Sequence, residues 1–118
     1  MSTLANFAVA LVALLHVYFL VLEVFLWNKP FGMRIFRLTP EFAKATKALA
    51  ANQGVYNGFL AAGLAWGLML GAAGDSIKIF FLCCVIVAGA VGAATVNRRI
   101  LWVQALPALT ALALVLVS

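Results

Sequence analysis

Four polar side chains cluster at the start of an otherwise apolar segment and could together bind a small molecule. They are Asn52, Gln53, Tyr56 and Asn57, within the stretch NQGVYNGFLAAGL. At about 100° per residue, these side chains occupy one arc of about 140° on a helix. Amides and a phenol can orient a ligand through hydrogen bonds. A segment that served only as a lipid-facing span would have no need of these groups.

Another apolar segment carries two titratable side chains, Glu23 and His16. Their spacing of seven residues is nearly two helical turns, so we expect both on one face, with His16 about 10 Å deeper in the membrane. Polar residues inside a membrane usually face a protein interior or a water-filled cavity. We therefore predict a polar pocket that opens toward the cytoplasm, with Glu23 as its charged member or proton carrier. The predicted pocket residues are Glu23, His16, Asn52, Gln53, Tyr56, Asn57 and Gln104.

Each of these polar residues also has a purely structural explanation. Glu23 can reach the lipid headgroups, or it can pair with an arginine from a connection, namely Arg34, Arg98 or Arg99. A single histidine such as His16 can bond a neighbouring backbone carbonyl. Membrane amides often join helices to one another, with a contribution of about 1 kcal/mol each. These explanations stay open beside the ligand site.

The composition indicates a membrane protein. Hydrophobic residues make up 67% of the 118 residues and charged residues only 9%, against about 25% charged residues in an ordinary soluble domain. A soluble protein with this balance could not cover its own surface, so the lipid bilayer is the expected partner. The net charge of +5 comes from cations beside the hydrophobic segments, where they orient a protein in the membrane. We therefore expect no nucleic-acid binding.

The cysteines and the histidine predict no metal or cofactor site. Cys83 and Cys84 are adjacent in an apolar run, and neighbouring helical residues point about 100° apart, which opposes a disulfide between them. We interpret both cysteines as small, buried apolar residues. One histidine is too few for a metal cluster, and no cofactor motif is present. We expect neither a metal nor a cofactor.

The hydrophobic pattern predicts an all-α fold, an integral membrane four-helix bundle in one domain over residues 1–118. The expected spans cover about residues 4–27, 52–73, 77–96 and 100–117, each long enough to cross ~30 Å of hydrocarbon. The first segment lacks the basic region of a signal peptide, so we expect it to be retained.

The charges of the connections predict the orientation of the bundle. The first connection, residues 28–51, carries five cations and one acid, and the third, residues 97–99, carries two cations. The second, residues 74–78, is neutral overall. Cations accumulate on the cytoplasmic side, so we expect both basic connections there and both termini outside. This places the chain in the cytoplasmic (plasma) membrane as a multi-pass protein.

The first connection contains a helix start. Thr39 suits an N-cap, Pro40 suits the first helical position, and Glu41 favours the positive end of the helix dipole. The second helix is therefore expected to begin about three turns before it enters the membrane.

Glycines form stripes of small residues on the predicted helices. Such stripes let helices approach closely, and one of them is available for a homo-oligomer. The predicted helix-packing residues are Gly54, Gly58, Gly63, Gly67 and Gly92.

Three motifs of this chain point to a known family. They are His16-x6-Glu23, Leu26-Trp27-x2-Pro30-x-Gly32-x3-Phe36 and Asn52-Gln53-Gly54-x-Tyr56-Asn57-Gly58-Phe59-Leu60-Ala61-Ala62-Gly63. With these motifs the sequence resembles an uncharacterised family of small four-span membrane proteins known as domain of unknown function 1304. The resemblance covers essentially the whole chain and implies four helices and a membrane location, with no established activity.

Three functions agree with this sequence, and we favour the first. The first is a site that binds or moves a small molecule or proton. Small multidrug transporters have a similar length and one acid in helix one, and by analogy Glu23 would exchange a proton for a substrate. The second is a structural or accessory subunit that packs against other membrane proteins. The third is a membrane enzyme for a lipophilic substrate, with Glu23 and Tyr56 as an acid/base pair.

Overall fold

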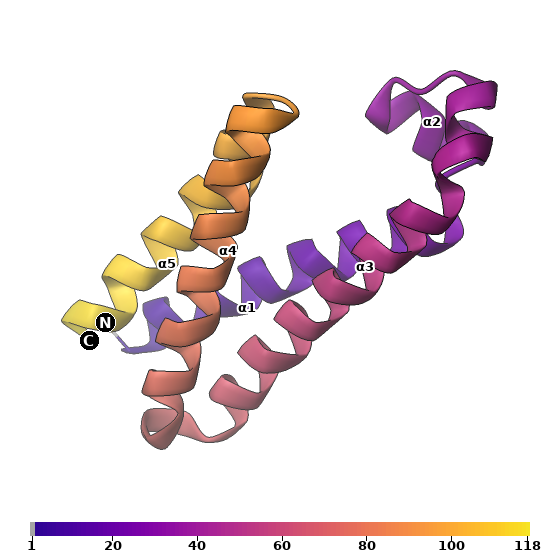
Figure 1. Cartoon of the computed structure of the whole chain (residues 1–118). Coiled ribbons are helices and arrows are strands. Elements are labelled where there is room, and N and C mark those ends of the chain that lie inside the picture. The colour runs from indigo at the N-terminus through magenta and orange to yellow at the C-terminus, as the bar shows by residue number, and fades with distance from the viewer. Residues whose placement is uncertain (1) are drawn as a thin grey trace. The chain divides into compact units, whose positions relative to one another are not determined.

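The protein folds into helices throughout the part of the chain that the computed structural model describes, residues 2–118. These residues contain five α-helices, two π-helical segments, one 3-10 segment and no strand. Figure 1 labels the α-helices. The all-helical prediction is therefore confirmed. In chain order the elements are α1 (Ser2–Leu20), η1 (Val21–Phe25), α2 (Pro30–Phe36), α3 (Pro40–Met69), η2 (Gly71–Gly74), α4 (Asp75–Thr95), η3 (Leu101–Ala105) and α5 (Leu106–Val117).

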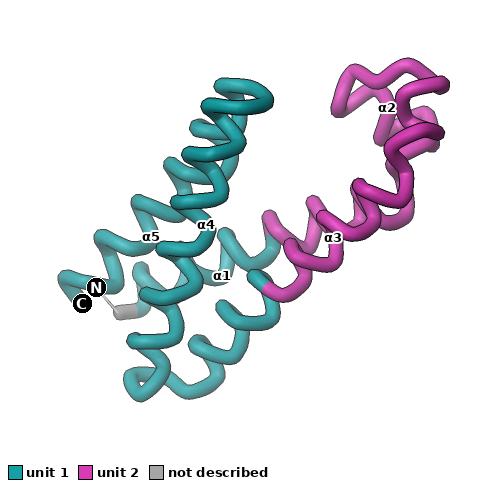
Figure 2. The backbone as a smooth tube through the Cα atoms, viewed as in Figure 1, with its two compact units in different colours: residues 1–14, 60–118 teal, residues 15–59 magenta. Residues whose placement is uncertain are grey.

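The chain divides into two compact units (Figure 2). Residues 1–14 and 60–118 form the first unit, and residues 15–59 form the second. Helices α1 and α3 are each divided between the two units. A single domain over the whole chain stays a prediction.

The first unit has an apolar core built from four helical segments. In this unit α4 and α5 lie side by side (Figure 1). Most core residues are Ala and Val, whose small side chains let helices approach closely, and their spacings of three and four residues define one face of each helix. The core consists of Ala5, Val9 and Val12 from α1, Leu64 from α3, Leu82 and Val85 from α4, and Ala108, Ala111 and Val115 from α5.

A glycine turn reverses the chain between α3 and α4. Gly71 has a φ of 62°, the left-handed conformation that commonly ends a helix. A Cβ atom at Gly74 would lie 2.0 Å from the carbonyl oxygen of Gly67, so the chain passes too close to α3 for any side chain there. Helix α4 begins at Asp75. The connection thus lies at residues 70–74, earlier than the expected 74–78, because an acid is favourable in the first turn of a helix.

Proline starts the short helix of the second unit, and a left-handed residue ends it. Pro30 holds the preceding Lys29 in an extended conformation (φ −99°, ψ 158°) and occupies the first position of α2. Arg37 ends α2 with φ 56° and ψ 49°, and its N–H donates to the carbonyl of Arg34. Glycine usually occupies such a position, so Arg37 holds a conformation that is unfavourable for its own side chain.

Helix α3 begins where the sequence predicted. The hydroxyl oxygen of Thr39 accepts a hydrogen bond from the backbone N–H of Phe42 at 3.2 Å, which is the N-cap interaction. Pro40 is the first helical residue and Glu41 lies in the first turn. The early start of this helix is therefore confirmed.

Trp27 fixes α2 against α3 within the second unit. Its indole N–H donates to the hydroxyl oxygen of Thr46 at 3.0 Å, and its ring lies 4.9 Å from that of Phe36 between centroids. A Cβ atom at Gly32 would lie 1.9 Å from the carbonyl oxygen of Leu26, so only glycine fits there. These contacts give the first connection a defined structure.

Two helical stretches among residues 2–118 are long and apolar enough to cross a membrane. They are Thr3–Phe25 and Gly71–Thr95, and Leu101–Val117 is a shorter apolar helix. Helix α3 is not among them, because its amides and Tyr56 lower its mean hydropathy. Four spans and the orientation of the termini stay predictions.

Candidate functional site

A carboxyl group and an amide from two distant parts of the chain meet in the second unit. The amide nitrogen of Asn57 on α3 donates to Oε1 of Glu23 on η1, at 2.5 Å. Asn57 is only 5% exposed, and Glu23 is half-buried. Two of the predicted site residues thus form one polar pair.

Glycines on α3 allow this close approach. A Cβ atom at Gly54 would lie 2.6 Å from a methyl carbon of Val24 and 3.2 Å from Cβ of Glu23. A Cβ atom at Gly58 would lie 2.8 Å from a methyl carbon of Leu20. The two glycines are one turn apart and flank Asn57, so the backbone of α3 lies against the segment that carries Glu23.

Glu23 lies at the centre of a π-helical turn. The backbone N–H of Leu26 donates to the carbonyl of Val21 at 3.2 Å and to that of Leu22 at 3.3 Å. Single π-helical turns inside α-helices occur frequently at functional sites. The expectation that Glu23 and His16 share a face assumed an uninterrupted α-helix, and η1 interrupts that helix from Val21.

The other predicted residues of the second unit differ in their exposure. Asn52 and Gln53 are exposed on α3. Tyr56 is 52% exposed, and its ring packs edge-on against Phe59. His16 is fully buried, with Phe19 edge-on at 5.3 Å between ring centroids. The structure thus brings Asn57 to Glu23, and it leaves the other amides and Tyr56 on the surface of α3.

Gln104 belongs to the first unit and is half-buried in η3. This second π-helical turn has a physical cause in the sequence, because Pro107 follows it. A proline inside a helix lacks the N–H of the regular ladder and clashes with the carbonyl four residues earlier. Both π-helical turns of residues 2–118 therefore carry a predicted site residue, in different units.

The remaining packing glycines also lie against neighbouring helices, in the first unit. A Cβ atom at Gly63 would lie 2.4 Å from the ring of Phe81. At Gly67 it would lie 2.8 Å from Cγ of Lys78, and at Gly92 it would lie 3.1 Å from Cγ2 of Ile100. Each of these glycines therefore sits at a helix–helix contact.

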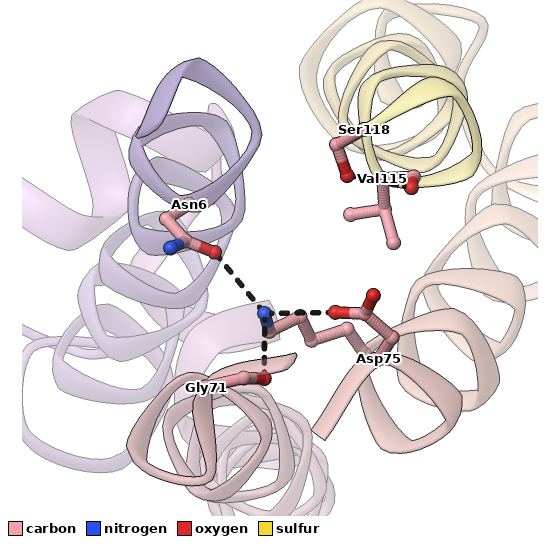
Figure 3. A network of polar contacts seen from close by, with 6 residues as sticks. Asn6, Gly71, Asp75, Val115 and Ser118 are labelled. Atoms are coloured by element: carbon pink, nitrogen blue, oxygen red, sulfur yellow. Dashed lines mark hydrogen bonds and ion pairs between the residues drawn. The ribbon is translucent and has the colours of Figure 1, made fainter. Parts of the chain in front are cut away.

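A polar cluster that the sequence did not predict surrounds a buried lysine in the first unit (Figure 3). Lys78 on α4 is 3% exposed, although lysine is almost never fully buried without a partner. Its ammonium group donates to Oδ1 of Asn6 at 3.1 Å, to Oδ1 of Asp75 at 3.2 Å and to the carbonyl of Gly71 at 3.4 Å. These three acceptors use all three of its N–H donors.

A cavity of about 290 Å³ lies beside this cluster. In Figure 3 the residues around it come from α1, η2, α4 and the end of α5. The cavity is lined by Ala5, Asn6, Gly71, Ala72, Asp75, Lys78, Val115 and Ser118. The spacing of Asp75 and Lys78, three residues apart on one helix, was the signal that could have indicated the ion pair.

The Glu23–Asn57 pair can do two kinds of chemistry. An ionised carboxylate that accepts one amide N–H has other lone pairs free for a cation or a ligand donor, and a protonated carboxyl group can donate its proton. Neither use requires a nucleophile. The Lys78 cluster holds a saturated ion pair, which stabilises structure more readily than it binds a further anion.

A family model and a relative each match most of the chain. The family model described as "Protein of unknown function (DUF1304)" matches residues 10–116. The "Uncharacterized protein YpaA" of Lactococcus lactis subsp. lactis (strain IL1403) is 30% identical over 96 residues, which cover 80% of this chain and 81% of that protein. No solved structure matches the chain.

Proposed function

The chain belongs to the DUF1304 family, as its motifs predicted. From its polar residues we propose that it is a multi-pass protein of the cytoplasmic membrane that binds or moves a small molecule or a proton at an intramembrane site. Glu23 is the charged member of this site, and Asn57 holds its carboxyl group in position. The site opens toward the cytoplasm.

The observation that carries this proposal is the hydrogen bond between Asn57 and Glu23. Glu23 lies near one end of Thr3–Phe25, a stretch apolar enough to cross a membrane. An ionisable residue inside a span is costly and marks an ion, proton or substrate site by default. A partner amide and a π-helical turn at the same residue both support a built site rather than a side chain that only reaches the headgroups.

The proposed topology has four spans with both termini outside. Two spans are Thr3–Phe25 and Gly71–Thr95, and the other two are the later part of α3 and the segment Leu101–Val117. Helix α3 has 30 residues, which gives about 45 Å at 1.5 Å per residue, more than the ~30 Å that a span needs. The excess corresponds to the early turns of α3 in the cytoplasmic connection.

Assembly into a homo-oligomer, or with other membrane subunits, is part of the proposal but does not use the Gly54 and Gly58 stripe. Both glycines lie against side chains of the chain's own α1 and η1. A second subunit would have to contact another face of the molecule.

Labelling with dicyclohexylcarbodiimide tests the site, because this reagent couples to protonated carboxyl groups in apolar surroundings. We expect peptide mass spectrometry to find the label on Glu23 in membranes. The control is Glu41→Gln, which removes an exposed acid outside the spans and leaves the labelling unchanged. Glu23→Gln removes it.

Proton uptake into proteoliposomes under an imposed membrane potential and native mass spectrometry in mild detergent complete the test. A flux or a small-molecule adduct that is present in the wild type and absent from Glu23→Gln supports the proposal. An unlabelled Glu23, together with identical flux and identical spectra for the two proteins, overturns it.

A further inference from the structure

The short helix α2 has two different faces. Its inner face carries Gly32, which packs on the backbone of Leu26, and Phe36, whose ring packs at a tilt against that of Trp27. Its outer face carries two exposed apolar side chains with a cation. These are Phe31 (43% exposed), Ile35 (38% exposed) and the exposed Arg34.

The spacing of these outer residues places them together. Positions i, i+3 and i+4 of a helix are neighbours on one face, so Phe31, Arg34 and Ile35 form one continuous patch. Arg37 follows directly at the end of α2 and is also exposed. We call these four residues the α2 surface.

The charge around the α2 surface is strongly positive. The segment from residue 28 to residue 51 carries five cations against one acid, and all six side chains are exposed. The cations are Lys29, Arg34, Arg37, Lys44 and Lys47, and the acid is Glu41. Exposed apolar side chains interleaved with cations are typical of segments that lie in the interface of an anionic membrane.

The shape of the surface is set before any partner binds. The hydrogen bond from Trp27 to Thr46 and the tilted ring contact between Trp27 and Phe36 hold α2 in place. The left-handed Arg37 fixes the exit of the chain. A preformed surface loses less conformational entropy on binding than a flexible loop.

We propose that the α2 surface binds the headgroups of anionic phospholipids in the cytoplasmic leaflet. Arg34 and Arg37 donate paired hydrogen bonds to headgroup phosphates, which suits the planar guanidinium group. Phe31 and Ile35 insert at the boundary between headgroups and acyl chains. The inference rests on the proposed membrane location and orientation, and it does not depend on the Glu23 site.

Native mass spectrometry of the full chain in mild detergent tests this directly. The protein is mixed with equal amounts of phosphatidylglycerol and phosphatidylcholine, and the ratio of retained lipids is measured. We expect the wild type to prefer phosphatidylglycerol, and the double variant Arg34→Gln/Arg37→Gln to bind it about thirtyfold more weakly, about fivefold for each cation removed. The charge-conserving variant Arg34→Lys/Arg37→Lys keeps most of the preference.

The matched control removes two cations elsewhere. Arg98 and Arg99 are adjacent, exposed and outside the α2 surface, so Arg98→Gln/Arg99→Gln should retain the preference for phosphatidylglycerol. The inference is overturned if Arg34→Gln/Arg37→Gln binds like the wild type, or if both double variants lose the preference equally. Circular dichroism of each variant shows that the helices are intact, as expected for exposed substitutions.

The outcomes separate this inference from the proposed function. Glu23→Gln should bind lipid like the wild type. Loss of the lipid preference in the α2 variants therefore supports lipid binding by the α2 surface, even if Glu23→Gln changes neither labelling nor flux. Extraction of the membranes with alkaline carbonate tests the membrane location itself, and release of the protein by that treatment overturns the premise that both proposals share.

Discussion

The ion pair of Asp75 and Lys78 allows a quantitative test of the packing of the first unit. The ammonium nitrogen lies 3.2 Å from Oδ1, and the two side chains are 3% exposed for Lys78 and 46% exposed for Asp75. Removing one partner of a fully buried ion pair costs about 3–5 kcal/mol. Because water screens the exposed half of Asp75, we expect Asp75→Ala to lower the free energy of unfolding by about 2 kcal/mol.

A second substitution, at Lys78, should restore part of the stability that Asp75→Ala loses. In Asp75→Ala the cost arises from a buried ammonium group without a counter-charge, so removal of that charge should restore stability. Lys78→Met keeps the apolar stem and its packing on Gly67, and replacing a buried ion pair by apolar residues is often neutral. The double variant Asp75→Ala/Lys78→Met should therefore be about 1 kcal/mol more stable than Asp75→Ala.

Unfolding by sodium dodecyl sulfate in mixed micelles, followed by circular dichroism, measures these differences. Glu41→Ala is a matched control, since it removes an exposed acid that also lies in the first turn of a helix. It should cost about 0.5 kcal/mol through the helix dipole alone. The reasoning is refuted if Asp75→Ala costs no more than Glu41→Ala, or if the double variant is less stable than Asp75→Ala.

Two further predictions concern helix packing and the first connection. Gly63→Ala should lower the free energy of unfolding by about 1–2 kcal/mol in the same assay, because the added Cβ meets an aromatic ring at 2.4 Å. Gly92→Ala is the control and should leave the stability nearly unchanged, because its added Cβ has its nearest neighbour at 3.1 Å. Trp27→Phe removes the hydrogen bond to Thr46 and should raise hydrogen exchange of the α2 amides about fivefold, or about 1 kcal/mol. Trp66→Phe, at a 55% exposed position, is the control, and equal exchange in both variants contradicts the role of this bond.

The sequence was most informative where local chemistry decides the structure. Thr39, Pro40 and Glu41 act within one turn of chain, so they predicted the start of α3 without knowledge of the rest of the fold. The hydrophobic runs likewise predicted helices close to the observed bounds. The left-handed conformation of Arg37 had no such signal, because most residues found there are glycine or asparagine.

The candidate site was harder to predict because it depends on which residues meet across helices. Depth in the membrane placed Glu23 and Asn57 at the same level, but only the packing of Gly54 and Gly58 shows that they form the pair. Lys78 was expected in the connection of residues 74–78, where only its charge was considered. Its burial depends on acceptors far away in sequence, such as Asn6.

The two π-helical turns also set the phase of the helices that contain them. A π turn encloses one more residue per hydrogen-bonded ring than an α turn, so a stripe of side chains that enters η1 leaves it rotated relative to an unbroken α-helix. Deleting one residue between Val21 and Phe25 would restore the α-helical phase and turn the preceding part of α1 by about 100°. That part includes Leu20, whose methyl carbon lies against Gly58. Within the second unit, a one-residue deletion at η1 would therefore prevent Leu20 and Glu23 from facing α3 together, so the Gly58 contact and the bond to Asn57 could not both form.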